Sequence, residues 1–246
     1  MSVKFENFKY SYTKNGKPIF VPSELGRKIG AELKSKIESS VQFEPFYYHL
    51  RSGGHVAALH EHRNNKYFAR LDIKRFFYSV TRNKVARTLQ RENVDRPIHY
   101  AKWSTVKNPY LAAGYVLPYG FVQSPILASL VLKNSVLGQA LTQVSNSLVV
   151  SVFVDDISIS GQDRKMIIDA YQILESAMVE SGFEPNADKA RLPAQEIDVF
   201  NCNLRKNFTA VQDNRIADFN QIERSIQSQA AFQRYCEQVT SGNTAQ

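Results

Sequence analysis

The sequence is poor in the features that mark secreted, membrane-bound and disulfide-rich proteins. It contains 2 cysteines, Cys202 and Cys236, too few for a disulfide framework or a zinc site, so both are expected to be packing thiols in a reducing compartment. No apolar run approaches the roughly 20 residues of a transmembrane helix. The first twelve residues alternate aromatic with charged side chains instead of forming a signal peptide. We therefore expect a cytoplasmic protein without a membrane partner.

The composition is that of an ordinary globular protein. Hydrophobic residues make up 43% and charged residues 22% of the chain, which excludes disordered, collagen-like and coiled-coil proteins. A length of 246 residues allows one full-sized domain with a small appendage. No internal repeat is present, so the fold is expected to come from one mixed domain.

Positive charge is the first feature that points to a partner. The chain carries 31 Lys and Arg against 23 Asp and Glu, a net charge of +8, and this excess favours polyanions. Between Arg63 and Lys107, twelve lysines and arginines face three acids, so this block alone has a net charge of +9. Any one of these residues could simply belong to a solvated helix face, but the block as a whole predicts contacts with a phosphate backbone. The nucleic-acid-binding candidates are Arg63, Lys74, Arg75, Arg82, Lys84 and, beyond the block, Gln123.

Hydrophobic periodicity and capping residues predict helices interleaved with antiparallel strands, an α+β fold. Leu148–Val154 and Ile157–Ser160 read as a hairpin around Asp155-Asp156. Three predicted helices are Gly26–Val41, Arg164–Glu180 and Asp218–Tyr235. A fourth is capped by Thr81 and ends near Glu92, and a fifth runs from Ser124-Pro125 through Leu141. The other predicted strands are Tyr67–Asp72, Ile197–Leu204 and Phe208–Val211.

Three carboxylates stand at strand ends. Asp72 closes a hydrophobic strand, and Asp155 and Asp156 form the hairpin tip. Taken singly, such acids are more often turn formers or helix caps. Two adjacent anions repel, however, so a positive group is expected beside them. Three convergent carboxylates are suitable ligands for Mg²⁺. Polymerases use a pair of such ions to bind the attacking and the leaving oxygen.

Four motifs follow one another along the chain. They are Leu71-Asp72-Ile73-Lys74-Arg75-Phe76-Phe77, Leu117 to Pro125, Phe153-Val154-Asp155-Asp156, and Gly182 to Asn186 with Lys189. In this order and spacing, the sequence resembles bacterial reverse transcriptases of the retron and group II intron kind, from about Tyr10 to about Leu204. The resemblance implies a right-hand polymerase with fingers, an antiparallel palm sheet and a truncated or missing thumb. The implied parts are fingers at 1–70, a palm strand at 71–80, a fingers-side insertion at 81–120, palm at 121–204 and a rudimentary thumb at 205–246.

The resemblance also implies roles for single residues. Asp72, Asp155 and Asp156 would be the metal ligands, and Lys189 a catalytic residue near the leaving pyrophosphate. Phe77 would exclude a 2′-hydroxyl by steric collision; core packing is the plain alternative, and both roles can hold together. The other implied nucleotide-binding residues are Ile73, Tyr119, Gly120 and, at the triphosphate, Lys17 with Arg27 as the alternative. Plainer interpretations exist for three of the candidates. Gly120 could simply form a turn, and Lys189 could be an unpaired loop lysine. His60 lies within a stretch similar to a retron motif and could be a core histidine.

The sequence departs from the family pattern in several places. Tyr119 stands where glutamine is usual, Phe153 replaces a tyrosine, and Arg75 takes a position that is often acidic. About forty residues follow Leu204, room for one thumb helix where the family has three. We therefore expect a partner protein, a second copy of the chain or a structured RNA to help hold the duplex.

The resemblance implies an RNA-directed DNA polymerase. Its cofactors would be two Mg²⁺ ions, with Mn²⁺ as a substitute, and its partners deoxynucleoside triphosphates, an RNA template or structured noncoding RNA, and the DNA product. By analogy, the setting would be bacterial antiphage defence. Two alternatives stay open at this point: a non-catalytic, palm-shaped RNA-binding subunit, and an untemplated or protein-primed polymerase, which Tyr119 favours.

Overall fold

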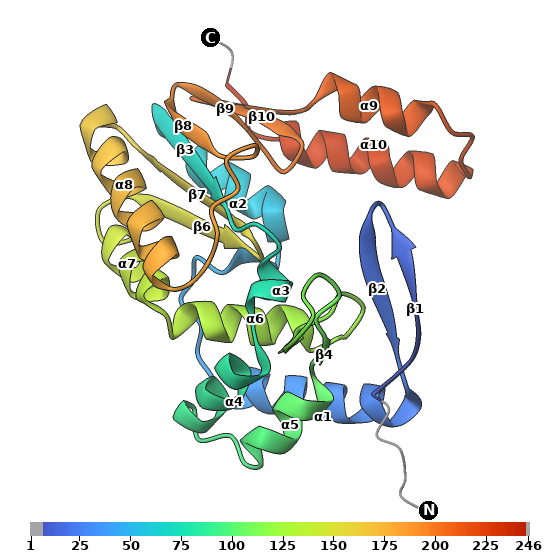
Figure 1. The fold of residues 1–246 in the computed structure, drawn as a ribbon. Coiled ribbons are helices and arrows are strands. Elements are labelled where there is room, and N and C mark those ends of the chain that lie inside the picture. Colours follow the sequence, from blue (N-terminus) through green and yellow to red (C-terminus); the bar gives the residue numbers. More distant parts are fainter. Residues whose placement is uncertain (1–6, 245–246) are drawn as a thin grey trace, which may run out of the picture. The chain divides into compact units, whose positions relative to one another are not determined.

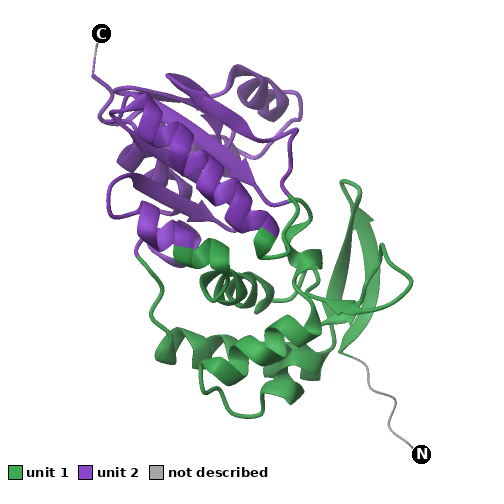
Figure 2. Ribbon diagram, turned by 60° about the vertical axis from the view of Figure 1, so that its left-hand side comes forward, with its two compact units in different colours: residues 1–44, 74–139, 180–184 green, residues 45–73, 140–179, 185–246 purple. Residues whose placement is uncertain are grey.

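The computed structural model describes residues 7–244, which form two compact units (Figure 2). Both units are assembled from segments far apart in the sequence. Unit 1 comprises Met1–Glu44, Lys74–Gln139 and Glu180–Glu184, and unit 2 comprises Pro45–Ile73, Ala140–Val179 and Pro185–Gln246. No helix within the described part of the chain has both the length and the apolar character that crossing a bilayer requires.

Unit 2 is built on a four-stranded antiparallel sheet in the order β6-β7-β3-β8 (Figure 1). The strands are β3 (Tyr67–Asp72), β6 (Val149–Phe153), β7 (Asp156–Gly161) and β8 (Arg191–Ala194). The predicted strand Tyr67–Asp72 and the predicted hairpin are thereby confirmed. Helix α2 (Gly54–His62) packs against β6 and β7. Helix α8 (Arg164–Glu180), also as predicted, runs alongside the sheet.

A second sheet in unit 2 has three strands in the order β11-β10-β9. The predicted strand Ile197–Leu204 is in fact two, β9 (Glu196–Val199) and β10 (Cys202–Arg205), followed by β11 (Phe208–Val211). Their buried side chains form one apolar cluster with Leu59 of α2, Phe68 of β3 and Val239. The cluster joins the two sheets of unit 2 into one body.

Two helices, not the one predicted over Asp218–Tyr235, close the chain. They are α9 (Asp213–Asn220) and α10 (Ile226–Thr240). The helix restarts because the Ser225 hydroxyl accepts a hydrogen bond from Ser228 N (3.3 Å) and caps α10. Stacking of Phe219 on Phe232, with centroids 3.9 Å apart, holds the two helices together.

The two cysteines behave as the sequence predicts. Both are free thiols, Cys202 buried and Cys236 half-buried, and burial raises the pKa of each. A raised pKa keeps the sulfur protonated and unreactive. They are therefore packing residues of unit 2.

Unit 1 combines helices with two short hairpins. The strands are β1 (Phe8–Lys14), β2 (Lys17–Pro22), β4 (Val106–Lys107) and β5 (Tyr115–Val116). The helices are α1 (Glu24–Ser40), α3 (Phe76–Ser79), α4 (Arg82–Arg91), α5 (Pro97–Trp103) and α6 (Ser124–Lys133). The predicted cap of α4 is confirmed, because Lys84 N donates to the Thr81 hydroxyl (3.3 Å).

The helix predicted from Ser124 through Leu141 is interrupted. It ends at Lys133, and α7 (Val136–Val144) starts anew. The Ser135 hydroxyl accepts a hydrogen bond from Gly138 N (3.2 Å), as a capping side chain does. Gln123, not Ser124, precedes the first helical residue of α6.

Candidate active site

The sheet of unit 2 brings the three predicted carboxylates to one place. Asp72, the last residue of β3, is the cross-strand partner of Asp156, the first residue of β7. Beyond them, Ile73 N donates to the Asp155 carbonyl (3.0 Å) and ties the two chain segments together. Asp72 is 83 positions from Asp155 and 84 from Asp156 in the sequence, and the register of two adjacent strands makes them neighbours.

The tip between β6 and β7 is a strained turn. Val154 has φ 61°, a left-handed conformation that is costly for a β-branched residue. Its backbone N donates to His49 Nδ1 (3.1 Å), and burial lowers the pKa of His49, which favours the neutral ring that can accept this bond. His49, which sequence reasoning missed, therefore helps to fix the turn that presents Asp155.

Two side chains hold the buried carboxylate of Asp72. Asn186 Nδ2 donates to Oδ1 (2.7 Å) and Lys189 Nζ donates to Oδ2 (2.9 Å). The same Nζ lies 3.9 Å from Asp155 Oδ2. Burial lowers the pKa of Lys189, but the hydrogen bond to Asp72 and the surrounding carboxylates outweigh it, and the net pKa is raised. Lys189 is thus a charged residue between two carboxylates and not an unpaired loop lysine.

Asp156 faces a different cation, Arg70 on β3. Arg70 Nη2 and Nε both donate to Asp156 Oδ1 (2.5 and 2.9 Å), and Arg70 Nη1 lies 3.3 Å from Asp198 Oδ2. Arg191 pairs with the same Asp198. Burial raises the pKa of Asp156 to about 6, against the attraction of Arg70 and together with the repulsion of Asp155. The positive charge that the sequence predicts beside the acid pair is therefore supplied by Lys189 and Arg70.

The fit to a divalent cation can be judged from these contacts. Among residues 7–244, no group of three or more His, Cys, Asp or Glu side chains stands ready to hold a metal ion. Asp72 and Asp155 nevertheless offer oxygens on either side of the Lys189 ammonium, and Mg²⁺ needs only one or two carboxylates besides water and phosphate. Both Arg70 bonds go to Oδ1 of Asp156. The donor set therefore fits a divalent ion that takes the place of the ammonium, and Asp156 as a third ligand stays a prediction.

Several predicted nucleotide-binding residues meet in unit 1. The ring of Tyr119 lies 4.8 Å from that of Phe77, and Lys17 Nζ lies 5.2 Å from the Tyr119 centroid. Phe20 N donates to the Tyr119 carbonyl (2.9 Å) and joins β2 to this loop. Phe77 is buried, 7% exposed, so it packs in the core as well. Arg27, the alternative to Lys17, lies exposed on α1.

The packing of the chain explains why residue 120 is a glycine. Its φ is 101°, and a Cβ there would lie 2.2 Å from the Phe20 carbonyl oxygen. We predict that Gly120→Ala lowers the free energy of unfolding by about 2–4 kcal/mol, because the backbone must shift and the conformation is strained. Gly114→Ala is the matched control, since Gly114 has φ 97° and nothing within 4 Å of its Cβ position. Equal losses in urea denaturation of the two variants would contradict the clash.

The predicted nucleic-acid-binding side chains differ in their surroundings. Lys74 pairs with Glu184 (2.5 Å), Arg63 donates to the Ser241 carbonyl, and Arg75 and Arg82 lie over the rings of Tyr110 (4.3 Å) and Tyr115 (3.6 Å). Gln123 is 1% exposed.

The burial of Gln123 gives it a packing role. Its Nε2 donates to the Ser104 hydroxyl (3.3 Å) inside unit 1, and a side chain at Gly30 would collide with it. The histidine of the predicted retron-like stretch is half-buried, and His60 Nε2 lies 3.2 Å from the Val239 carbonyl. This contact agrees with its interpretation as a core histidine.

Known proteins are similar to this chain in part of its sequence and in its fold. Retron Ec73 reverse transcriptase of Escherichia coli is 30% identical over 128 residues, which cover 47% of this chain and 40% of that protein. Two structures of the foamy viral protease-reverse transcriptase, one in complex with double-stranded DNA and one with an RNA/DNA hybrid, align with TM-scores of 0.54 and 0.53 at 14% and 15% identity. Each alignment covers 90% of this chain but only 34% and 26% of the viral chain.

The chain thus spans less than half the length of these relatives. At this low identity, the structural alignment with the viral enzymes shows a shared fold alone. A family model described as reverse transcriptase (RNA-dependent DNA polymerase) matches residues 8–204, which hold the carboxylates, Lys189, Tyr119 and Phe77. The chain therefore belongs to the reverse transcriptase family.

Proposed function

We propose that this chain is an RNA-directed DNA polymerase whose catalytic centre is the carboxylate cluster of unit 2. The observation that carries the proposal is the meeting of Asp72 and Asp155 on either side of the Lys189 ammonium at one end of a sheet. Buried carboxylates of this kind attract cations, and enzymes of this family use divalent metal ions. Family membership and the basic block support a nucleic-acid substrate.

The proposed reaction is attack of a primer 3′-hydroxyl on the α-phosphate of a deoxynucleoside triphosphate, with release of pyrophosphate. Asp72 and Asp155 would hold Mg²⁺, or Mn²⁺ in its place, with Asp156 as the predicted third ligand of a two-ion site. When bound, such ions stabilise the charge that develops on the attacking and leaving oxygens. Lys189, released from Asp72, would neutralise or protonate the leaving pyrophosphate.

The other parts of the proposal rest on the resemblance. The sheet of unit 2 would be the palm, the hairpin β1-β2 would belong to the fingers, and the nucleotide would contact Ile73, Tyr119, Gly120 and Lys17. The enzyme would act in bacterial antiphage defence, together with a partner protein, a second copy of the chain or a noncoding RNA. Similarity to a retron enzyme supports this setting.

Primer extension tests the proposed function. The purified chain is incubated with Mg²⁺, a poly(rA) template, an oligo(dT) primer and each labelled deoxynucleotide in turn. We expect incorporation of dTTP only, because the template selects the complementary base. Incorporation of all four nucleotides without regard to template would support an untemplated polymerase, and RNA binding without any incorporation would support the non-catalytic subunit. Both results would contradict the proposal.

Phe77 provides a test of sugar selection. If its ring excludes a 2′-hydroxyl, Phe77→Val raises the incorporation of ribonucleotides relative to deoxyribonucleotides by about 10-fold or more. Phe77→Tyr retains the ring and should leave the ratio near the wild-type value. The ratio does not depend on the folded fraction, so destabilisation by the smaller side chain cannot imitate the effect. An unchanged ratio in Phe77→Val would leave Phe77 with a packing role alone.

A further inference from the structure

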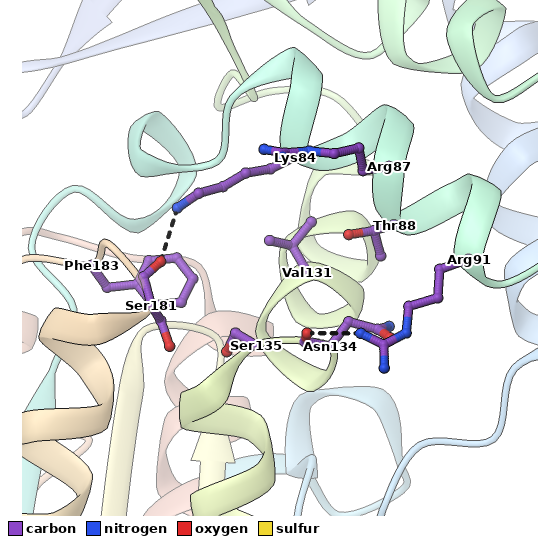
Figure 3. Close-up of a pocket in the computed structure, with 9 residues that line it drawn as sticks. All are labelled: Lys84, Arg87, Thr88, Arg91, Val131, Asn134, Ser135, Ser181 and Phe183. Carbon is purple, nitrogen blue, oxygen red and sulfur yellow. Dashed lines mark hydrogen bonds between the residues drawn. The ribbon is translucent and has the colours of Figure 1, made fainter.

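A cavity of about 300 Å³ lies in unit 1 against one face of α4 (Figure 3). Three cations of α4 line it at the three- and four-residue spacing that places side chains on one helix face. The end of α6 and the segment after α8 supply the other walls. The lining residues are Lys84, Arg87, Thr88, Arg91, Val131, Asn134, Ser135, Ser181 and Phe183. All nine are described by the structure, and none is acidic.

The three cations have no carboxylate partner in the described part of the chain. Lys84 Nζ donates to the carbonyls of Ser181 (3.1 Å) and Gly182 (3.4 Å). Arg87 Nε and Arg91 Nη1 donate to the carbonyls of Asn83 (3.3 Å) and Asn134 (3.5 Å). Carbonyl dipoles orient these side chains but leave their charges uncompensated.

Some other cations of the basic block are neutralised. Arg70, Lys74 and Arg96 each form an ion pair with a carboxylate. Glu92, which follows the last residue of α4, accepts a hydrogen bond from Asn134 Nδ2 (2.6 Å) and forms no ion pair with the cations of the cavity within residues 7–244. The cavity thus gathers three positive charges of the block that no carboxylate of the described residues neutralises.

The surroundings of Lys84 add to this argument. The Lys84 ammonium lies over the Phe183 ring, with Nζ 4.6 Å from the centroid. Burial, followed by the charge of Arg87, lowers the pKa of Lys84. A bound anion would offset both effects, because a negative charge close to the ammonium favours its charged form.

We propose that this cavity binds a phosphate group, carried by a nucleic-acid backbone or by a free nucleotide. Arginine forks and a lysine ammonium are the side chains that recognise phosphate oxygens, and the Thr88 hydroxyl can donate its hydrogen to the same oxygens. The volume is at the lower end of ligand pockets, enough for a phosphate with its attached sugar. The proposal does not depend on catalysis at the carboxylates.

The test compares two double variants of the full chain that remove the same charge. Arg87→Gln/Arg91→Gln alters the cavity, and Arg164→Gln/Lys165→Gln alters exposed cations at the start of α8. All four side chains are exposed, so both variants should fold, which thermal unfolding checks. Binding is measured by fluorescence anisotropy of a labelled 12-nucleotide single-stranded RNA across a NaCl series, and by calorimetry with ATP.

If a nucleic-acid backbone occupies the cavity, the cavity variant binds the RNA at least about 10-fold more weakly than wild type, with a salt slope smaller by about one to two. The control variant should lose less than about threefold. If a free nucleotide occupies it, the same loss appears with ATP and not with the RNA. Equal losses in both variants, or no loss with either probe in the cavity variant, would overturn the proposal.

Discussion

Asp72→Asn and Asp155→Asn are each expected to reduce the rate of primer extension by about 10³-fold or more. Each change removes a negative charge from the pair of oxygens on either side of Lys189 Nζ, and a neutral amide is a poor ligand for Mg²⁺. The shape of the side chain is retained. At residue 72 the amide oxygen can still accept a hydrogen bond from Asn186, which now donates to Asp72 Oδ1, so the fold should persist.

Asp188→Asn is the matched control for both substitutions. Asp188 lies one residue before Lys189 and is exposed, and among residues 7–244 its backbone carbonyl, not its side chain, accepts a hydrogen bond, from Arg191. This variant should extend primers at about the wild-type rate. An active Asp155→Asn enzyme, or an Asp188→Asn enzyme as inactive as Asp155→Asn, would show that loss of charge at this site is not the cause.

Acid is expected to destabilise the protein through one buried histidine, His62. Its Nδ1 lies 2.7 Å from the Ser160 hydroxyl oxygen and its Nε2 lies 2.8 Å from that of Ser151. The side chain is 1% exposed, and burial lowers its pKa to about 3. The neutral ring thus links α2 to β6 and β7 behind the carboxylate hairpin.

The sign of the effect follows from this lowered pKa. Below the ordinary histidine pKa of about 6.5, the unfolded chain binds a proton that the folded chain does not. The stability linked to neutral His62 is therefore fully present above pH 6.5 and is lost progressively as the pH falls towards 3. From pH 7.5 to pH 5.0, His62 alone should lower the free energy of unfolding by about 2 kcal/mol.

Urea denaturation of His62→Gln at the two pH values isolates this effect. Glutamine can bond to both serines but does not titrate, so the loss of stability between pH 7.5 and 5.0 should be smaller than in wild type by about 2 kcal/mol. Replacement of the exposed His99 by glutamine should leave the wild-type pH dependence unchanged. If wild type and His62→Gln lose the same stability, His62 is not the titrating group.

Local patterns in the sequence predict the placement of the carboxylates. Strict alternation over Ile157–Ser160 and the apolar run before it predict the hairpin, and the polar break between them locates Asp155 and Asp156 at its tip. That the strand ending at Asp72 lies beside this hairpin was implied only by the resemblance to reverse transcriptases, because burial alone does not determine which strands pair. The hairpin tip thus depends on short-range information, whereas its meeting with Asp72 depends on strand pairing across 84 residues.

The ion pairs around Asp156 could not be predicted in the same way. Arg70 and Asp198 are 128 residues apart, and their contact depends on the packing of β9 against β3. A weak signal does exist, because Arg70 shares a face of β3 with Asp72, two residues away. Helix breaks at Ser135 and Ser225 were also missed by apolar periodicity, since a serine cap interrupts a helix without interrupting its hydrophobic pattern.

A crystal structure with Mn²⁺, a primer-template and a non-hydrolysable deoxynucleotide tests the central claim most directly. Anomalous scattering at the manganese edge locates the ion without reference to activity. We predict a peak about 2.1 Å from carboxylate oxygens of Asp72 and Asp155, with the Lys189 ammonium moved away from Asp72. Manganese absent from these oxygens, with Lys189 still bonded to Asp72 in the complex, would contradict the account.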